Sequence, residues 1–283
     1  MRRPEPLLPL ERASFLDGVI GPVSSLVSRV LRPAWVADAL HGVWLGHPLH
    51  PAAVQLPVGA FLSAGILDAL PTGRRSATTL IGVGGATAVP AAAAGLADWS
   101  QGLRKQQRVG LVHASANTAA LGMYASSLVQ RGRGRSGRPA AYAGLALVSL
   151  GAYIGGHLSY RQASGANHAE DVPNVVPAGW QDLCAVDDLP PDGTAQRRVL
   201  DAVPLLVVRD GARVHVLADR CSHLSGPLHE GTIADGCVTC PWHGSVFSLT
   251  DGAGVHGPAT APQPAFDVRV DGGRVMVCLP GAG

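Results

Sequence analysis

Four residues in two short motifs are the side chains of this sequence best suited to bind metal. Cys221 stands two residues before His223, and Cys240 stands three residues before His243. Sixteen residues separate His223 from Cys240. Cysteine thiolates and histidine imidazoles are common metal ligands in proteins. The two motifs therefore predict a metal centre built from two loops that approach each other in the folded chain.

Two kinds of metal centre combine cysteine with histidine. A tetrahedral zinc ion takes these ligands, but zinc fingers separate a pair of cysteines from a pair of histidines. Here each loop offers one cysteine and one histidine. Cys221 and His223 are also too close in the sequence to form the ligand pair of a zinc finger. In a [2Fe–2S] cluster, two thiolates can bind one iron while two imidazoles bind the other. The pattern favours this cluster, with each loop giving one ligand to each iron.

The C-terminal region, residues 180–283, resembles a Rieske iron–sulfur domain over its whole length. The stretch DRCSHLSGPLHEGTI is similar to the first cluster loop of that family, and CPWHGSVFSLTDG is similar to the second. HGPATAPQP is similar to the proline-bearing segment that covers the cluster. The resemblance implies that Cys221 and Cys240 bind the buried iron. It also implies that His223 and His243 bind the solvent-facing iron.

The chain departs from the Rieske proteins of quinol-oxidising bc complexes, in which a disulfide joins the two cluster loops. Gly226 and Trp242 stand at those positions, so the chain resembles the ferredoxin-type and oxygenase-type members instead. Ser245 stands where a serine donates a hydrogen bond to the cluster in high-potential members, whereas Phe247 replaces a tyrosine donor. Hydrogen bonds to the sulfurs tune the reduction potential. We therefore expect a cluster-tuning role for Ser245 and a potential below that of the bc-type proteins.

Short runs of β-type residues surround the two motifs. Turn dipeptides such as Asp210-Gly211 and Asp271-Gly272 interrupt these runs, which is typical of hairpins. This alternation of short β-type runs and turns predicts an all-β domain of about 100 residues. The expected strands are 203–208, 214–218, 236–239, 246–249, 266–270 and 275–279.

The first half of the chain is poor in charge, which indicates a membrane domain. Charged residues make up 15% of the 283 residues, against about 25% in ordinary soluble domains. Uncharged runs in this half are long enough to cross a hydrocarbon core of about 30 Å as helices. Short loops that carry most of the positive charge connect them. We expect four membrane helices, within 52–70, 76–97, 109–130 and 139–160.

These patterns predict a multi-domain protein with an N-terminal all-α four-helix transmembrane bundle and a C-terminal all-β Rieske iron–sulfur domain. Residues 1–34 form an N-terminal segment whose helical part either lies in the membrane interface or packs on the bundle. Residues 35–162 form the transmembrane domain, and residues 163–179 form a polar linker. Residues 180–283 form the Rieske [2Fe–2S] domain.

Three histidines stand near the ends of the expected membrane helices. His50, His113 and His157 fall on one side of the membrane if the four helices alternate in direction, and the C-terminal domain lies on that side too. We therefore expect the three in one layer facing the cluster. Ionisable residues at membrane depth indicate function. Three interpretations stay open: helix caps bonded across the interface, ligands of haem b or another metal, or a quinone site.

The helical region also resembles a known family, the bacterial membrane proteins called domain of unknown function 2231. The resemblance covers roughly residues 35–167 and rests on three stretches. It supports the four helices and the histidine positions, but it implies no established chemistry for them. The stretches are LHGVWLGHPLHPAAVQLPVGAFLSAGILDAL, ADWS at 97–100 and GGHLSYRQASGAN at 155–167.

We expect a membrane-anchored Rieske-type electron-transfer protein that passes electrons between a soluble partner and a haem or quinone in its membrane domain. An electron-carrier component is favoured over a self-contained enzyme, because the 40 residues after His243 are too few for the mononuclear iron domain of an oxygenase. Membrane lipid and a redox protein or quinone are the expected partners. The net charge of +2 gives no reason to expect nucleic acid.

A non-catalytic redox sensor or assembly subunit is the alternative function, with the three membrane histidines in structural roles. The expected location is the cell membrane, which the chain crosses several times. Positive charges near the helix ends number five on one side and six on the other, so they do not set the orientation. We expect the Rieske domain in the cytoplasm, because the sequence shows no export signal and no loop disulfide.

Overall fold

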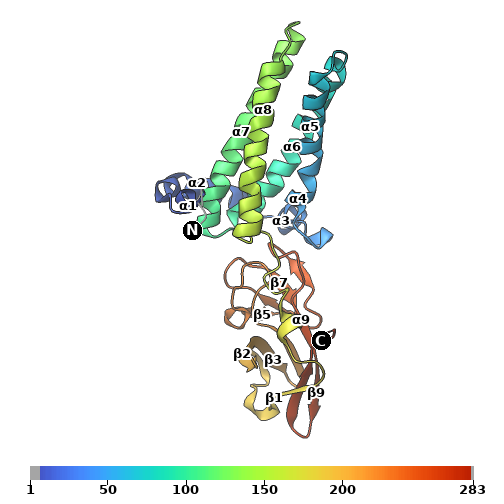
Figure 1. Ribbon diagram of the computed structural model, residues 1–283. Helices are drawn as coiled ribbons and strands as arrows, with labels where there is room; N and C mark the ends of the chain where they lie inside the picture. Colours follow the sequence, from blue (N-terminus) through green and yellow to red (C-terminus); the bar gives the residue numbers. More distant parts are fainter. Residues whose placement is uncertain (1–6, 282–283) are drawn as a thin grey trace, which may run out of the picture. The chain divides into compact units, whose positions relative to one another are not determined.

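The computed structural model describes residues 7–281 and divides into two compact units (Figure 1). The first unit comprises the described residues up to Val36 together with Pro48–Gly165. The second comprises Ala37–His47 together with the described residues from Ala166 onward. The chain therefore passes from one unit to the other three times. The first six residues of the predicted N-terminal segment lie outside the described residues.

Four long helices make up most of the first unit: α5 (Gln55–Ala69), α6 (Arg74–Ser100), α7 (Arg104–Gly132) and α8 (Arg138–Gly156). Helix α5 packs along α6, α7 packs along α8, and α6 packs against α7 (Figure 1). Glycines bring these helices close together. A Cβ atom at Gly84 would lie 2.5 Å from the ring of Phe61, so a larger residue there would force α5 and α6 apart.

Shorter elements flank the long helices. Helix α8 continues into one π-helical turn, η3, and α9 belongs to the second unit. The short elements are α1 (Leu8–Glu11), η1 (Ser14–Leu16), α2 (Asp17–Val30), α3 (Ala34–His41), η2 (Val43–Leu45), α4 (Leu49–Ala53), η3 (His157–Arg161) and α9 (Val172–Val175).

Three helical stretches among the described residues are long and apolar enough to cross a membrane: Leu49–Ala69, Arg74–Ser100 and Arg138–Arg161. The bent pair α2 and α3 adds a fourth if it is counted as one span. The helical region with three to four candidate spans is therefore confirmed. Helix α7 differs from the prediction, because it is long enough but does not belong to this apolar set. Its arginine, lysine and glutamine side chains lower its hydropathy.

A buried ion pair connects three of the long helices. The Arg131 guanidinium on α7 donates to both carboxylate oxygens of Asp68 on α5, and both side chains are buried. Arg131 also donates to the hydroxyl of Ser127 at 3.0 Å and to that of Thr78, on α6, at 3.3 Å. Two charges removed from water are tolerated here because they neutralise each other and their hydrogen bonds are satisfied.

The second unit is all-β, as predicted. Its six-stranded antiparallel sheet has the order β1-β10-β9-β4-β3-β2, and its four-stranded sheet has the order β5-β6-β7-β8. Each of the six expected strands is present with ends within two residues of the prediction. The strands are β1 (Gln181–Ala185), β2 (Asp192–Leu200), β3 (Val203–Asp210), β4 (Arg213–Ala218), β5 (Thr232–Ala234), β6 (Cys237–Thr239), β7 (Val246–Ser248), β8 (Gly254–His256), β9 (Ala265–Asp271) and β10 (Arg274–Cys278).

The segment expected to be a polar linker, 163–179, differs from the prediction. Most of it packs on the β unit: Val172 and Val176 are buried in the core between the long strands. The backbone N–H of His168 donates to the carbonyl of Ser222 at 2.8 Å. The two valines lie four residues apart around α9, so one turn places both apolar side chains on the sheet.

Candidate functional site

Two tight loops form the candidate metal centre, one after β4 and one between β6 and β7. In the first loop, the N–H of Cys221 donates to the carbonyl of Gly226 at 2.9 Å. In the second, the N–H of Cys240 donates to the carbonyl of Ser245 at 2.8 Å. Each loop thus folds back onto its own cysteine, and the cysteine and histidine of one motif project from a single turn.

The structure places the four predicted ligands together at these two loops. Cys221 and Cys240 are buried, with 1% and 3% of their surfaces exposed. The rings of His223 and His243 are partly exposed, and their centroids lie 5.0 Å apart at nearly a right angle. A sulfur pair therefore lies inside the unit, and an imidazole pair lies nearer its surface.

The loop backbone favours negative charge on the buried sulfurs. The pKa of Cys240 is lowered to about 6, first because the Cys221 thiol donates to its sulfur. The N–H groups of Trp242 and His243 lower this pKa further. The pKa of Cys221 is raised, because its thiol gives that hydrogen bond to Cys240 and because it is buried. Thiolate is the form of cysteine that binds metal, so the loop is arranged for a sulfur ligand.

Both histidines are held in the neutral form. Burial lowers the pKa of His223 to about 3, with smaller contributions from His243, His41 and His168. Burial also lowers the pKa of His243. A neutral imidazole has a nitrogen lone pair available for a metal ion. The imidazole pair is therefore ready to bind metal at neutral pH.

The donor set fits a [2Fe–2S] cluster better than a single zinc ion. A structural zinc ion needs four protein ligands, whereas each iron of this cluster needs two. The loops also approach closely, because a Cβ atom at Gly226 would lie 2.9 Å from the sulfur of Cys240.

Gln263 holds the first loop and was not found from the sequence. Its buried amide oxygen accepts the N–H of Ser222 at 3.0 Å. Its amide nitrogen donates to the carbonyls of Ala218 and Arg220 at 2.8 and 2.6 Å. The available signal was a lone amide between two prolines in the segment expected to cover the cluster.

Asp219 is a second support that the sequence did not reveal. Its carboxylate accepts both the backbone N–H and the ring Nδ1–H of His229, at 2.7 and 2.6 Å. Arg197 approaches the same carboxylate at 3.5 Å. The side chain is 3% exposed, so these contacts satisfy a buried charge. Its position two residues before Cys221 was the available signal.

Ser245, the predicted tuning residue, is fully buried behind the second loop. Its hydroxyl oxygen accepts the backbone N–H of Ala259 at 3.0 Å. This contact uses the oxygen and leaves the hydroxyl proton available to another acceptor. Phe247 is fully buried in the core and has no donor group, as its residue type requires.

Residues 37–47 come from the helical half of the sequence but complete the β unit. The Asp38 carboxylate accepts the ring Nδ1–H of His256 at 2.8 Å and the N–H of Gly257 at 2.9 Å. Val43 packs so closely that a Cβ atom at Gly257 would lie 2.9 Å from it. The 37–47 segment therefore holds the proline-bearing segment, a role that the predicted domain boundary at residue 35 did not foresee.

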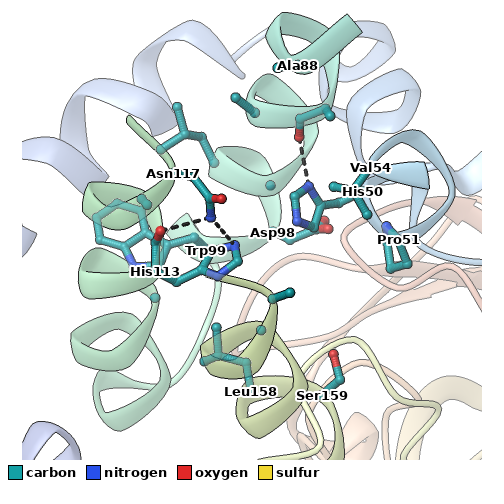
Figure 2. A pocket seen from close by; sticks show the side chains of 18 of the residues that line it. His50, Pro51, Val54, Ala88, Asp98, Trp99, His113, Asn117, Leu158 and Ser159 are labelled. Atoms are coloured by element: carbon teal, nitrogen blue, oxygen red, sulfur yellow. Dashed lines mark hydrogen bonds between the residues drawn. The ribbon is translucent and has the colours of Figure 1, made fainter. Parts of the chain in front are cut away.

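The first unit encloses a cavity of about 560 Å³ between α4, α5, α6, α7 and α8 (Figure 2). Its lining is mostly apolar, with many alanine and glycine residues. His50 and His113 reach into it from opposite sides (Figure 2). Their ring centroids are 6.3 Å apart, and the ring planes are nearly perpendicular. Two of the three predicted membrane histidines therefore share one cavity.

Backbone carbonyls fix the protonation of both cavity histidines. The Nδ1 atom of His50 is 2.8 Å from the carbonyl of Ala91, and that of His113 is 2.8 Å from the carbonyl of Gly151. Because a carbonyl only accepts, each Nδ1 carries the proton, and each Nε2 keeps a lone pair in the neutral ring. The amide nitrogen of Asn117 lies 3.3 Å from Nε2 of His113 (Figure 2).

His157, the third predicted membrane histidine, is bound elsewhere in the same unit. Its Nε2 atom lies 2.8 Å from the carboxylate of Glu11. It is not among the residues that line the cavity. The expected layer of three histidines is therefore a facing pair plus one histidine tied to the N-terminal segment.

Two family models match separate parts of the chain. The Rieske [2Fe-2S] domain matches residues 179–267. The family described as predicted membrane protein DUF2231 matches residues 46–168. The first match contains both cluster loops, and the second contains the two cavity histidines.

Curated relatives match the C-terminal part. Ferredoxin CarAc of Metapseudomonas resinovorans is 34% identical over 98 residues, which are 35% of this chain and 92% of the relative. The anthranilate 1,2-dioxygenase ferredoxin subunit of Burkholderia cepacia is 36% identical over 100 residues, with the same shares. A solved ferredoxin of carbazole 1,9a-dioxygenase from Nocardioides aromaticivorans IC177 is 30% identical. That match covers 36% of this chain and 99% of the ferredoxin, with a TM-score of 0.34.

Proposed function

The chain belongs to the Rieske [2Fe–2S] family, and on that basis we propose that it passes single electrons between a soluble partner and a redox group in its membrane domain. Its second unit is a Rieske ferredoxin-like electron-carrier domain, and its first carries a predicted membrane domain. The observation that carries the proposal is the pair of buried thiols beside a pair of neutral imidazoles on two adjoining loops. A bound [2Fe–2S] cluster supplies one-electron chemistry at that place.

Each ligand has a distinct role in this proposal. Cys221 and Cys240 hold the inner iron, and the loop N–H groups stabilise the negative charge of their sulfurs. His223 and His243 hold the outer iron. Ser245 donates its remaining hydroxyl proton toward the cluster and so favours the reduced state, which carries one more negative charge.

A soluble redox protein is the proposed partner of the cluster. The Burkholderia cepacia relative is named as the ferredoxin subunit of a dioxygenase, which is a ferredoxin that works with other proteins. Trp242 adjoins the outer ligand His243, with ring centroids 6.4 Å apart, and is 51% exposed. Exposed aromatic side chains are enriched at protein interfaces. The surface beside the histidine ligands therefore suits transient docking.

A haem or quinone in the cavity is the proposed second partner. The cavity is mostly apolar and about 560 Å³ in volume, and two histidine rings face each other across it. A cavity of this size and lining suits a redox group.

An anaerobic titration tests the carrier function on the full chain purified in detergent. We expect one reducing equivalent to bleach the cluster band, and an oxidised acceptor such as a soluble quinone analogue to restore it over repeated cycles. The His223→Ala variant loses the band, whereas the matched His215→Gln variant on β4 keeps it. A band that does not respond to reductant, or that is not restored by any acceptor, contradicts the proposal.

A redox sensor or assembly subunit is the second candidate, and one observation favours it. Asp38 connects the segment over the cluster to the chain that leads directly into the membrane domain at Pro48. A change in the oxidation state of the cluster could therefore be transmitted along residues 37–47 to the membrane domain. The rate at which the acceptor reoxidises the reduced chain, followed by stopped flow, separates the two candidates, because a carrier returns its electron rapidly in every cycle, whereas a sensor needs no fast turnover.

A further inference from the structure

We propose that His50 and His113 are the two axial ligands of a single haem iron in the cavity of the first unit. The inference rests on the proposed electron-carrier function and identifies its membrane redox group. Two helices supply the ligands: His50 lies on α4, and His113 lies in the first half of α7. Residues of α6 and α8 also line the cavity between them.

The separation of the rings matches two imidazoles on opposite sides of one metal ion. A metal–nitrogen bond of about 2.0 Å, plus roughly 1.1 Å from nitrogen to ring centre, places two such centroids about 6.2 Å apart. The observed centroid separation is 6.3 Å. The rings approach from opposite walls of the cavity, with space between them (Figure 2).

The hydrogen bonds behind each ring are those of metal-binding histidines. A ligating imidazole commonly donates its other N–H to a carbonyl or carboxylate, which fixes the tautomer and the ring orientation. Both Nδ1 atoms have this contact, each at 2.8 Å to a helix carbonyl. Glycines make room for both rings. A Cβ atom at Gly95 would lie 2.7 Å from Nδ1 of His50, and one at Gly155 would lie 3.2 Å from Cε1 of His113.

The surroundings favour haem over a bare metal ion. Only two protein ligands face each other, and among the described residues no third His, Cys, Asp or Glu joins them to complete a site. A porphyrin supplies four further nitrogens itself. The cavity volume of about 560 Å³ and its apolar lining suit a large, flat, apolar ring.

One contact in the cavity competes with the iron for His113. With Nδ1 protonated, Nε2 of His113 accepts the amide N–H of Asn117 at 3.3 Å, and Asn117 must turn away when iron binds. In the proposed step the reduced cluster loses one electron and the ferric haem gains it, becoming ferrous. A reduced soluble redox protein then reduces the cluster again. No proton needs to move between the two centres.

Haem content and hemin binding test the site on the full chain in detergent. We expect one haem per chain, with the spectrum of a low-spin iron bound by two imidazoles. A reductive titration should then take two equivalents, one for the cluster and one for the haem. His50→Ala and His113→Ala should each weaken hemin binding by at least roughly tenfold and remove the second equivalent. His47→Ala, an exposed histidine outside the cavity lining, is the matched control and should keep both.

The cluster signal reports folding in every variant, so a failed variant is recognised. Loss of haem with an unchanged cluster signal in His50→Ala and His113→Ala supports the site. Equal hemin binding by the wild type and by both variants overturns the proposed haem site. A wild type that holds quinone but neither contains nor binds haem also overturns it. In these two cases the cluster still takes its one equivalent, and the carrier function stands. A wild type without a reducible cluster overturns the carrier function itself.

Discussion

Ser245 is the residue that we propose adjusts the potential of the cluster. It is fully buried, and its oxygen already accepts the N–H of Ala259. Its proton is therefore the donor left for a cluster sulfur. Phe247, which lies two residues later, adds no second donor. We therefore expect one hydrogen bond to the cluster from these two positions rather than two.

The Ser245→Ala variant should have a lower midpoint potential than the wild type. Loss of one hydrogen bond worth about 0.5–1.5 kcal/mol corresponds to a decrease of roughly 20–65 mV for a one-electron couple. A spectroelectrochemical titration measures the shift. Ser248→Ala, which removes a hydroxyl bonded to the N–H of Thr250, is the control and should leave the potential unchanged. An unchanged midpoint in Ser245→Ala would show that the hydroxyl does not reach the cluster.

The Gln263→Leu variant should lose its cluster more easily. Leucine fills a similar volume but leaves one N–H and two carbonyls of the first loop without their buried partner. Each unsatisfied group costs about 1–3 kcal/mol. The urea concentration at which the cluster band disappears should fall, whereas Gln196→Leu on β2 should change it little. Equal urea midpoints for Gln263→Leu and the wild type would contradict this role.

At the residue scale, the sequence identifies ligands more readily than their supports. The candidate ligands were recognisable because each cysteine lies two or three residues from its histidine, and the structure brings the four together. Gln263 contacts the first loop from 41 residues away, and Asp38 contacts the proline-bearing segment from more than 200 residues away. No local pattern encodes such a contact, because only the fold brings these polar groups together.

At the element scale, the 37–47 segment belongs to the β unit although it lies far from the Rieske match in the sequence. The family model matches residues 179–267, so the match includes no counterpart of this segment. Asp38 and Val43 hold the proline-bearing segment at Gly257. The stability of the cluster should therefore depend on residues far outside the Rieske match.

The Asp38→Ala variant should lower the temperature at which the cluster band bleaches. The change removes two hydrogen bonds, to His256 and Gly257, and the partly exposed position limits the cost to about 1–2 kcal/mol. A melting curve of the visible band measures this. Asp187→Ala, an exposed aspartate of the same unit, should leave the curve unchanged. Identical curves for both variants would show that the 37–47 segment does not hold the cluster cover.

The Asp68→Asn variant should destabilise the helical unit. It leaves the Arg131 guanidinium buried without its carboxylate partner, and breaking a buried ion pair in this way costs about 3–5 kcal/mol. Thermal unfolding in detergent, followed by helical circular dichroism, should show a lower midpoint. The exposed Arg133→Gln variant, at the residue that follows the last residue of α7, is the control. A midpoint equal to that of the wild type would mean that the pair is not needed to hold α5, α6 and α7 together.

Helices and strands could be predicted from the sequence where a single hydrophobic pattern extends over a whole segment. The long uncharged runs became α5, α6 and α8, and the alternating runs became strands of the two sheets. Helix α7 formed as well, but its mixed polar and apolar residues place it outside the apolar candidate spans. The packing of α9 on the β unit was not predictable, because two valines in a polar stretch give too weak a periodic signal.

At the scale of the whole molecule, the chain joins an electron-carrier unit to a helical unit through three short connections. The cavity histidines lie on the first unit, and the cluster loops lie on the second. A polar linker over residues 163–179 was expected from the sequence. Most of it, including α9, packs on the β unit instead.

The whole account depends on iron and sulfide held by two cysteines and two histidines. The most direct test combines metal and sulfide analysis of the purified chain with low-temperature EPR of the reduced protein. The account predicts two irons and two sulfides per chain, and a Rieske-type signal that disappears in His223→Ala but persists in His215→Gln. A chain that contains zinc without sulfide, or a signal that survives His223→Ala, would contradict it.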